Sequence, residues 1–394
     1  MIFSKKLDII YIENEGKEEI VMKLLDYIKS HNDWEELLSH DPYNLKNSRD
    51  DGYIMFKYDQ IASDFSYEEV REARGIIFYE QTWDCVCHPF NKFGNYGESY
   101  CPNIDWNTAS VQEKVDGSLI KVWYHNNEWH VSTNGTIDAF KANLNDNLKF
   151  KTFGDLFSAA INHYFQYENW NEAVDPTCTY MFELVSPFNR VVIPYEKIDC
   201  YFLGWRDNHT DKELNPKDCF LSDYFPIPKR YKLNTLTDVL NAAKALPWDK
   251  EGYVVCDEYF NRVKIKSPQY VMAHYMRNNN VINEERLVQV VLDGEQAEFS
   301  IYASDYIDDL IQIETLMKEI ADSAVKQVKT IYGAQYEFEN RGQYARDVLK
   351  TPNYMRDFLF HCFDDRIFWD YAKSWSAEKW LKAINELRER KQNA

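Results

Sequence analysis

Residues 113–133 read EKVDGSLIKVWYHNNEWHVST, and this stretch indicates the kind of fold that the chain adopts. Two runs rich in β-branched and aromatic residues, 118–124 and 129–133, flank the polar segment HNNE at 125–128. Such runs on either side of a short polar loop are typical of a β-hairpin. We therefore expect antiparallel strands here, with the charged segment EKVDGS leading into the first of them.

Similar β-rich runs recur on both sides of this hairpin and alternate with turn signals. They are GIIFYE at 75–80, TYMFELV at 179–185, CYFLGW at 200–205, EGYVVC at 251–256 and RVKIKS at 262–267. Helical patterns are expected at 18–30, 66–73, 150–167 and 235–245. Short strands interspersed with helices predict an α+β domain of antiparallel sheets over residues 1–275.

The last part of the chain, 276–394, has a different character. It contains only 3 of the 13 glycines and 1 of the 12 prolines. So few helix breakers predict an all-α domain. Apolar residues spaced three and four apart indicate a long amphipathic helix at 304–332, and further helices are expected at 353–373 and 376–391.

The composition excludes several classes of protein. The formal net charge of the 394 residues is -19, so a general nucleic-acid coat is not expected, and RNA binding would need a local basic patch. No run of 18 apolar residues predicts a membrane span, and the first residues do not resemble a secretory signal. The eight cysteines form no CxxC pair, and the nine histidines show no HxH or HExxH spacing, so a zinc site is not expected.

Five short segments of the first domain place charged residues inside or beside β-rich runs. They are RGIIF at 74–78, EKVDGS at 113–118, FELV at 182–185, EGYVV at 251–255 and VKIK at 263–266. Each segment alone is weak evidence for a functional site, because Asp-Gly is a common hairpin turn and a single glutamate often faces solvent from a strand. Charges within apolar strands are costly unless they converge on a polar ligand, so the whole series favours one shared site.

The two lysines of the VKIK segment sharpen this expectation. Residues at i and i+2 of a strand point to the same face, so Lys264 and Lys266 can both reach one phosphate group.

In order and spacing, the series KxDG, FE, EGYV and KxK resembles the covalent nucleotidyltransferases, the superfamily of ATP-dependent ligases and mRNA capping enzymes. More narrowly, the chain resembles the bacteriophage RNA ligase 1 family of tRNA-repairing ligases. That narrower resemblance rests on RGIIF at 74–78, NKFGN at 91–95, SPQY at 267–270 and the helical tail. It implies a nucleotidyltransferase (ATP-grasp-like ligase) domain at 1–275 and an RNA-specificity domain at 276–394.

The resemblance implies roles for individual residues. Lys114 would be the nucleophile that attacks the α-phosphate of ATP to form a lysyl-AMP. A lysine has an ordinary pKa of about 10.4, so Lys264, Lys266 and a bound Mg²⁺ would be needed to favour its neutral form. Glu251 would act through the metal or the attacking lysine, and Glu183 would hold ribose hydroxyls or metal-bound water. The remaining nucleotide contacts would be Tyr58, Arg74, Lys92, Glu113, Asp116, Gly117 and Tyr270.

The implied cofactors are ATP and Mg²⁺, with Mn²⁺ as a substitute, and Glu183 and Glu251 are the expected metal ligands. The implied partners are single-stranded RNA ends, most specifically a nicked tRNA anticodon loop, together with a separate end-healing kinase or phosphatase. A monomer in the cytoplasm is expected, which means the host cytoplasm if a phage encodes the chain.

One segment departs from the family pattern, which usually presents a basic residue before a Gly-Ser pair. Here residues 132–136 read STNGT without a charge, so RNA or ribose contacts there would rely on neutral hydrogen bonds. Two other functions stay open. A DNA ligase or capping enzyme would use the same lysine but usually carries a β-barrel after the basic pair. A non-catalytic RNA-end-binding protein would not need every charged position of the series.

Overall fold

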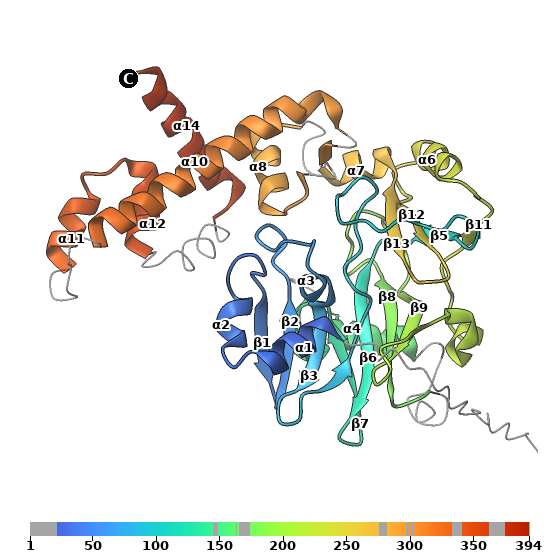
Figure 1. Cartoon of the computed structure of the whole chain (residues 1–394). Coiled ribbons are helices and arrows are strands. Elements are labelled where there is room, and N and C mark those ends of the chain that lie inside the picture. The colour runs from blue at the N-terminus through green and yellow to red at the C-terminus, as the bar shows by residue number, and fades with distance from the viewer. Residues whose placement is uncertain are drawn as a thin grey trace, which may run out of the picture.

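The computed structural model describes residues 22–144, 149–162, 164, 174–275, 282–296, 299–300, 303–332, 341–361 and 375–393 (Figure 1). Three antiparallel sheets fill the first two thirds of the chain, and helices form the rest. This confirms the α+β fold class that the strand and helix patterns predict. None of the described helices is long and apolar enough to cross a membrane.

The N-terminal sheet has the order β1-β2-β3-β4, with β1 (Lys46–Asp50), β2 (Tyr53–Lys57), β3 (Arg74–Tyr79) and β4 (Asp84–Cys87). Helices α1 (Lys23–Ser30), α2 (Trp34–Leu38) and α3 (Glu68–Glu72) accompany it. Apolar residues of α1 and α3, such as Leu24 and Val70, pack in one core with Phe56 and Ile76 of the sheet. Helix α1 confirms the helix expected at 18–30 over residues 23–30. Residues 18–21 lie outside the described residues.

The central sheet has the order β10-β9-β8-β6-β7. Its strands are β6 (Ser118–His125), β7 (Glu128–Thr133), β8 (Cys178–Val185), β9 (Asp199–Asp207) and β10 (Glu213–Leu214). The predicted hairpin is β6–β7, whose turn residues Asn126 and Asn127 have φ values of 50° and 64°. Both values suit a type I′ turn, which asparagine tolerates well. Helix α4 (Phe153–Ile161) packs on this sheet and begins with a capping box between Thr152 and Asp155.

The third sheet has the order β11-β5-β12-β13, with β5 (Ser110–Lys114), β11 (Arg230–Tyr231), β12 (Gly252–Cys256) and β13 (Arg262–Lys266). Helix α6 (Leu236–Lys244) covers it through Val239 and Ala243, which share a core with Val255 and Ile265. This sheet brings the EKVDGS, EGYVV and VKIK segments onto adjacent strands.

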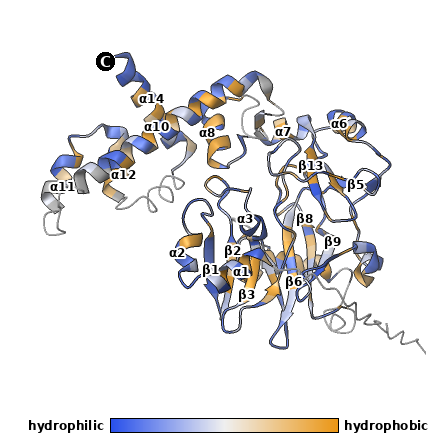
Figure 2. Cartoon of the chain, viewed as in Figure 1, coloured by the Kyte–Doolittle hydropathy of each residue, from blue (hydrophilic) through white to orange (hydrophobic). Residues whose placement is uncertain are grey.

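The C-terminal helices are α8 (Glu284–Leu292), α10 (Ile307–Tyr332), α11 (Arg341–Val348), α12 (Asn353–His361) and α14 (Ala377–Gln392). Figure 1 shows them to one side of the sheets, and Figure 2 shows hydrophobic and hydrophilic residues alternating along α10. The long helix predicted at 304–332 is present from residue 307, after a short 3₁₀ turn at 304–306. The helix expected at 353–373 is described only to His361, because residues 362–374 lie outside the described part.

The core of these helices does not begin at residue 276. Tyr270 and Val271 of α7 (Pro268–Tyr275), together with Val192, belong to the same buried cluster as Leu287, Ile320 and Trp380. The apolar contact between the two parts of the chain therefore starts within α7, just after the basic pair of β13.

Candidate active site

The third sheet places two of the predicted catalytic residues, Lys114 and Lys266, in one row across three strands. In the strand register Lys114 of β5 lies opposite Gly252 of β12, and Gly252 lies opposite Lys266 of β13. A side chain at position 252 would not fit, because a Cβ there would come within 2.3 Å of the Ile265 carbonyl oxygen, and the φ of +149° also favours glycine. The close approach of the two backbones brings Glu251 beside both lysines.

Glu251 is the centre of this row. Its Oε1 lies 2.7 Å from the Lys114 Nζ and 3.8 Å from the Lys266 Nζ. The residue is only 4% exposed, and among the described residues its Oε2 has no hydrogen-bond partner. A buried carboxylate oxygen normally has a donor or a cation beside it. The unsatisfied Oε2 is therefore a position where a cation or a hydroxyl group fits.

Glu183 approaches the same row from the central sheet. It lies on β8, whose backbone packs against Gly117: a Cβ on Gly117 would meet the Leu184 carbonyl oxygen at 2.4 Å and the Glu183 Cγ at 3.0 Å. Burial raises the pKa of Glu183 to about 7, and the charges of Lys114 and Arg74 oppose this rise. Glu183 thus lies within electrostatic reach of the Lys114–Glu251 pair, although strands of two different sheets carry them.

A loop from the N-terminal part completes the cationic side of the site. Lys264 donates its backbone N–H to the Gly94 carbonyl and accepts one from Tyr96, so the NKFGN segment pairs with β13. The Arg74 guanidinium and the Lys264 ammonium lie 5.2 and 5.6 Å from the centre of the Phe93 ring. Arg74, Lys264 and Phe93 therefore form one group, although the sequence places them far apart.

Tyr58 and Lys92 form a second group next to this one. The Lys92 ammonium lies 5.1 Å from the centre of the Tyr58 ring and 5.0 Å from that of Phe65. Within the described part of the chain, the buried Nη1 of Arg74 has no hydrogen-bond partner. Together with the Oε2 of Glu251, it is a second buried polar atom at this site that a bound molecule could satisfy.

Asp116 is held by the protein itself. Its Oδ2 accepts hydrogen bonds from the backbone N–H groups of Val192 and Ile193, and its Oδ1 accepts one from the Tyr270 hydroxyl. Asp116 is only 4% exposed, and its three hydrogen bonds hold the loop that follows Lys114 in place. The geometry therefore favours a positioning role for Asp116 and Tyr270 over direct contact with a nucleotide.

Glu113 lies apart from the lysine row. Side chains alternate along a strand, so Glu113 and Lys114 point to opposite faces of β5. The Glu113 Oε1 accepts a hydrogen bond of 3.1 Å from the Lys250 ammonium. Its side chain is thus not among those that the structure gathers around Glu251.

The uncharged segment at 132–136 lies beside a cation that the motif series does not include. Lys121 of β6 is fully buried and donates a hydrogen bond to the Gly75 carbonyl, next to Arg74. Burial lowers the pKa of Lys121 to about 8. A Cβ on Gly75 would lie 2.8 Å from the Lys121 Nζ and 2.9 Å from the Asn134 carbonyl oxygen, so all three meet at one point. The only sequence signal for this contact is a lysine inside the apolar run SLIKVWY.

Glu183 and Glu251 can supply two of the oxygen ligands that a hard cation such as Mg²⁺ needs, but not a complete set. Among the described residues, no three side chains of His, Cys, Asp or Glu form a ready cluster for a metal ion. Mg²⁺ typically takes one or two carboxylates and completes its shell with water and phosphate oxygens. Glu251, with its unsatisfied oxygen, and the nearby Glu183 fit that pattern.

The family described as RNA ligase matches residues 72–270, which is about half of the chain and includes the whole lysine row. The chain belongs to the RNA ligase family. The match spans every segment of the motif series and ends at Tyr270.

Two relatives illustrate this membership. A bifunctional polynucleotide kinase/RNA ligase of Autographa californica nuclear polyhedrosis virus is 32% identical over 276 residues, or 65% of this chain and 38% of that protein. The RNA ligase of Rhodothermus phage RM378 is 24% identical over 393 residues and covers 83% of this chain and 87% of its own length. The chain thus spans about two fifths of the length of the first relative.

Among solved structures, an archaeal ATP-dependent RNA ligase has a TM-score of 0.43 and 12% identity, covering 72% of this chain and 78% of that one.

Proposed function

We propose that this member of the family is an ATP-dependent RNA ligase that joins a 5′-phosphate end to a 3′-hydroxyl end. The observation that carries the proposal is the contact of the Lys114 Nζ with the Glu251 Oε1 at 2.7 Å, with Lys266 beside the same oxygen. A lysine that must become a nucleophile needs a group that accepts its proton and cations that attract the phosphate. Lys114 and Lys266 lie in one row of one sheet, and Glu251 lies beside both.

In the first step of this proposal, the Lys114 amine gives its proton to Glu251 and attacks the α-phosphate of ATP. A phosphorus–nitrogen bond forms, the bond between the α- and β-phosphates breaks, and pyrophosphate leaves. Lys264 and Lys266 stabilise the charge that develops on the α-phosphate. Arg74 and Lys92 hold the phosphates that leave. Glu251 and Glu183 would hold Mg²⁺, which would add further positive charge at the phosphates when bound.

The second and third steps use the same row with RNA. The 5′-phosphate of the RNA attacks the lysyl-AMP, which frees the Lys114 amine and gives an RNA with a 5′-adenylyl cap. The 3′-hydroxyl then attacks the capped phosphate, forms the phosphodiester bond and releases AMP. Lys264 and Lys266 serve the first two attacks, which both occur at the phosphate of AMP. In the third step the RNA 5′-phosphate is attacked, and the two lysines stabilise the charge on the AMP that leaves.

We further propose a biological setting for this chemistry. The substrate would be a broken tRNA anticodon loop, and the C-terminal helices would recognise the folded RNA. An end-healing kinase or phosphatase would prepare the ends, in line with the name of the viral relative, a bifunctional polynucleotide kinase/RNA ligase. We propose that the chain acts as a monomer in the cytoplasm.

Two alternatives are disfavoured by specific observations. DNA ligases and capping enzymes usually carry a β-barrel after the basic pair, whereas every described element from residue 268 onward is a helix. A protein that only binds RNA ends would have no need for a glutamate at 2.7 Å from Lys114.

A substrate panel tests the proposal. The protein is incubated with ATP, Mg²⁺ and one of three 5′-phosphorylated substrates: single-stranded RNA, single-stranded DNA or a nicked duplex. Ligation should be strongest with single-stranded RNA, and a broken tRNA stem-loop should exceed generic RNA. Preference for the nicked DNA duplex would indicate a DNA ligase instead. Binding of RNA ends without ligation or self-labelling by ATP would indicate a binding protein.

A further inference from the structure

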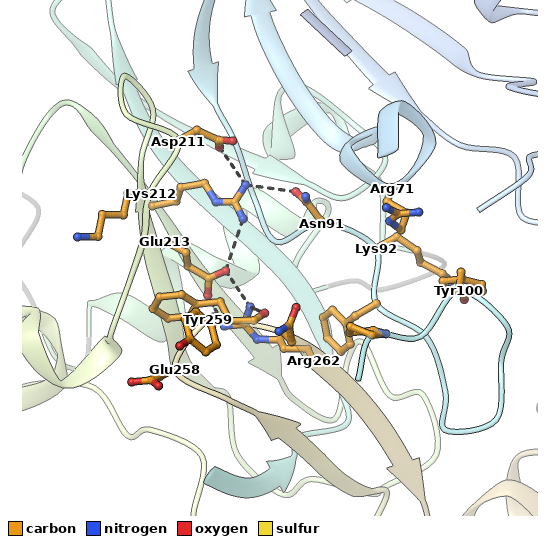
Figure 3. A pocket seen from close by; sticks show the side chains of 15 residues that line it. Arg71, Asn91, Lys92, Tyr100, Asp211, Lys212, Glu213, Glu258, Tyr259 and Arg262 are labelled. Atoms are coloured by element: carbon orange, nitrogen blue, oxygen red, sulfur yellow. Dashed lines mark hydrogen bonds and ion pairs between the residues drawn. The ribbon is translucent and has the colours of Figure 1, made fainter. Parts of the chain in front are cut away.

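A pocket of about 740 Å³ lies beside the candidate active site (Figure 3). It lies between the loop that carries NKFGN and the tips of the β9–β10 and β12–β13 hairpins. It is lined by Arg71, Asn91, Lys92, Phe93, Tyr100, Pro102, Arg206, Asp211, Lys212, Glu213, Glu258, Tyr259, Phe260, Asn261 and Arg262. Its volume is in the range of small-molecule sites, about 300–1,000 Å³. With the exception of Lys92, these residues have no part in the chemistry proposed above.

The floor of the pocket is an ion-pair network in which two arginines are neutralised by two carboxylates. The Arg206 Nη1 lies 3.2 Å from the Asp211 Oδ1, and Glu213 binds both Arg206 and Arg262. Asp211 also lies 2.7 Å from His88, which is fully buried. Because these charges largely cancel, the remaining lining has three cations, Arg71, Lys92 and Lys212, against one carboxylate, Glu258. The pocket therefore favours an anionic ligand.

One wall of the pocket is a turn that displays an aromatic side chain. Tyr259 is 70% exposed at the tip of the β12–β13 hairpin. The next residue, Phe260, has a φ of +61°, which is unfavourable for an aromatic residue. The Asp257 carboxylate holds this turn by accepting hydrogen bonds of 3.0 Å from the backbone N–H groups of Tyr259 and Asn261. A strained and well-anchored turn that exposes a tyrosine is typical of a functional surface.

The opposite wall provides the charge. Figure 3 shows Arg71, Lys92 and Tyr100 across the pocket from Tyr259 and Arg262. The Arg71 Nη1 donates to the carbonyl oxygens of Phe65 and Ser66, which fixes its guanidinium in place. An aromatic side chain facing two cations is the combination that binds a nucleotide, because the ring stacks on a base and the cations attract the phosphate.

Strand β13 connects this pocket to the lysine row. Arg262, Lys264 and Lys266 alternate with buried residues, so all three point to one face. Four residues of strand separate Arg262 in the pocket from Lys266 beside Glu251, which is about 13 Å. Phe93 lines the pocket and also lies against the Lys264 and Arg74 cations. A strand of nucleic acid with its end at Lys114 could therefore continue into the pocket.

We propose that this pocket binds an internal nucleotide of the RNA strand whose end reacts at Lys114, with Tyr259 stacked on its base. This inference rests on the proposed ligase function, and it names a part of the RNA path that the motif series does not include. The pocket lies too far along β13 to hold the reacting phosphate itself. Apart from Lys92, which the proposed first step also uses, the residues of the pocket would contribute to the binding of RNA and not to the formation of lysyl-AMP.

The test compares Tyr259→Ala and Tyr259→Phe with the matched control Phe220→Ala, an aromatic residue that is 45% exposed outside the pocket. The dissociation constant of fluorescently labelled, 5′-phosphorylated single-stranded RNA is measured by anisotropy, and self-labelling by ATP is measured in parallel. Tyr259→Ala should weaken RNA binding about tenfold, whereas Tyr259→Phe should bind like the parent because stacking does not need the hydroxyl. Self-labelling should be unchanged in all three variants.

Several results would overturn the proposal. One is equal RNA affinity for Tyr259→Ala and the parent. Another is slower self-labelling of Tyr259→Ala, because the pocket would then serve ATP. Crosslinking of 4-thiouridine RNA to the unaltered protein gives a readout that does not depend on the folding of a variant. Crosslinks should map to 257–262, and crosslinks found only elsewhere would contradict the proposal. Failure of the parent to self-label or ligate would instead count against the proposed function.

Discussion

The Tyr270 hydroxyl donates a hydrogen bond of 2.8 Å to the Asp116 Oδ1, and both residues are buried. Asp116 is two residues after Lys114, and Tyr270 belongs to the buried cluster of the C-terminal helices. This hydrogen bond therefore joins the loop that follows Lys114 to the helical part of the chain, across 154 positions of sequence.

We expect Tyr270→Phe to lower both stability and the rate of self-labelling. The change leaves the Asp116 Oδ1 buried without that donor, which costs about 1–3 kcal/mol. Chemical denaturation measures the first effect, and single-turnover labelling with ATP measures the second. Tyr231→Phe is the control, because Tyr231 is a half-buried tyrosine of β11 that packs against the Tyr253 ring and is not among the partners of Asp116. Equal labelling rates for Tyr270→Phe and the parent would show that this hydrogen bond does not position Lys114.

Lys264 and Lys266 should matter for rate more than for folding. Both lie on the same face of β13, and loss of one preorganised electrostatic contact slows a reaction about 10²–10³-fold. Alanine at either position should therefore slow single-turnover self-labelling by that factor, and arginine should restore it only in part. Lys244→Ala, on the exposed side of α6, is the control. Rates within threefold of the parent would remove these lysines from the site.

The C-terminal helices should determine which RNA is joined. A chain that ends at residue 280 should still form lysyl-AMP, because all of the motif segments and Tyr270 precede this point. It should lose its preference for a broken tRNA stem-loop over generic RNA. It should also melt at a lower temperature, because Val192, Tyr270 and Val271 lose the helices that cover them.

A cooperative melt is the control for this truncation. If the shortened chain folds but cannot label itself, or if it keeps the full preference for tRNA, the proposed division of labour is wrong.

Glu72 should make stability depend on pH. Burial raises its pKa to about 7 from an ordinary value of 4.5, and the backbone N–H groups of Lys23 and Leu24 donate to it. The folded state holds the proton more tightly than the unfolded state. Stability therefore falls as the pH rises from about 4.5 to about 7.

In Glu72→Gln, the drop in the free energy of unfolding between pH 5 and pH 8 should be smaller by up to about 3 kcal/mol. The control is Glu68→Gln, whose side chain is 57% exposed. Denaturation at the two pH values tests this, and an identical drop in the parent and Glu72→Gln would show that Glu72 does not carry the shift.

Local signals were enough for much of the fold. The β6–β7 hairpin follows from two β-rich runs around a polar segment, and the helices after 276 follow from apolar spacing and few breakers. The helix α8 was not expected, because its nine residues are too few for a clear period. Composition places the domain boundary at 275, but it does not reveal that Tyr270 and Val271 pack with the C-terminal helices.

The sequence likewise predicts some features of the candidate site and not others. The alternation of side chains along β13 predicts that Lys264 and Lys266 lie on one face. The structure agrees, because both lysines are partly exposed and the residues between and before them are buried. The partner of Glu113 could not be predicted, because Lys250 approaches it from a loop. Nor could the burial of Lys121 below Gly75, since that contact forms between two sheets. Contacts of this kind depend on tertiary packing, which local sequence patterns do not encode.

We propose that Lys114 is the residue that carries AMP. The most direct measurement is to incubate the protein with ATP and Mg²⁺, digest it and locate the AMP by mass spectrometry. We expect an acid-labile adduct on Lys114, in the peptide that contains residues 113–118. We expect none in Lys114→Ala, nor in Lys114→Arg, because a guanidinium is not deprotonated at working pH. AMP on another residue, or an acid-labile label that persists in either variant, would contradict the account.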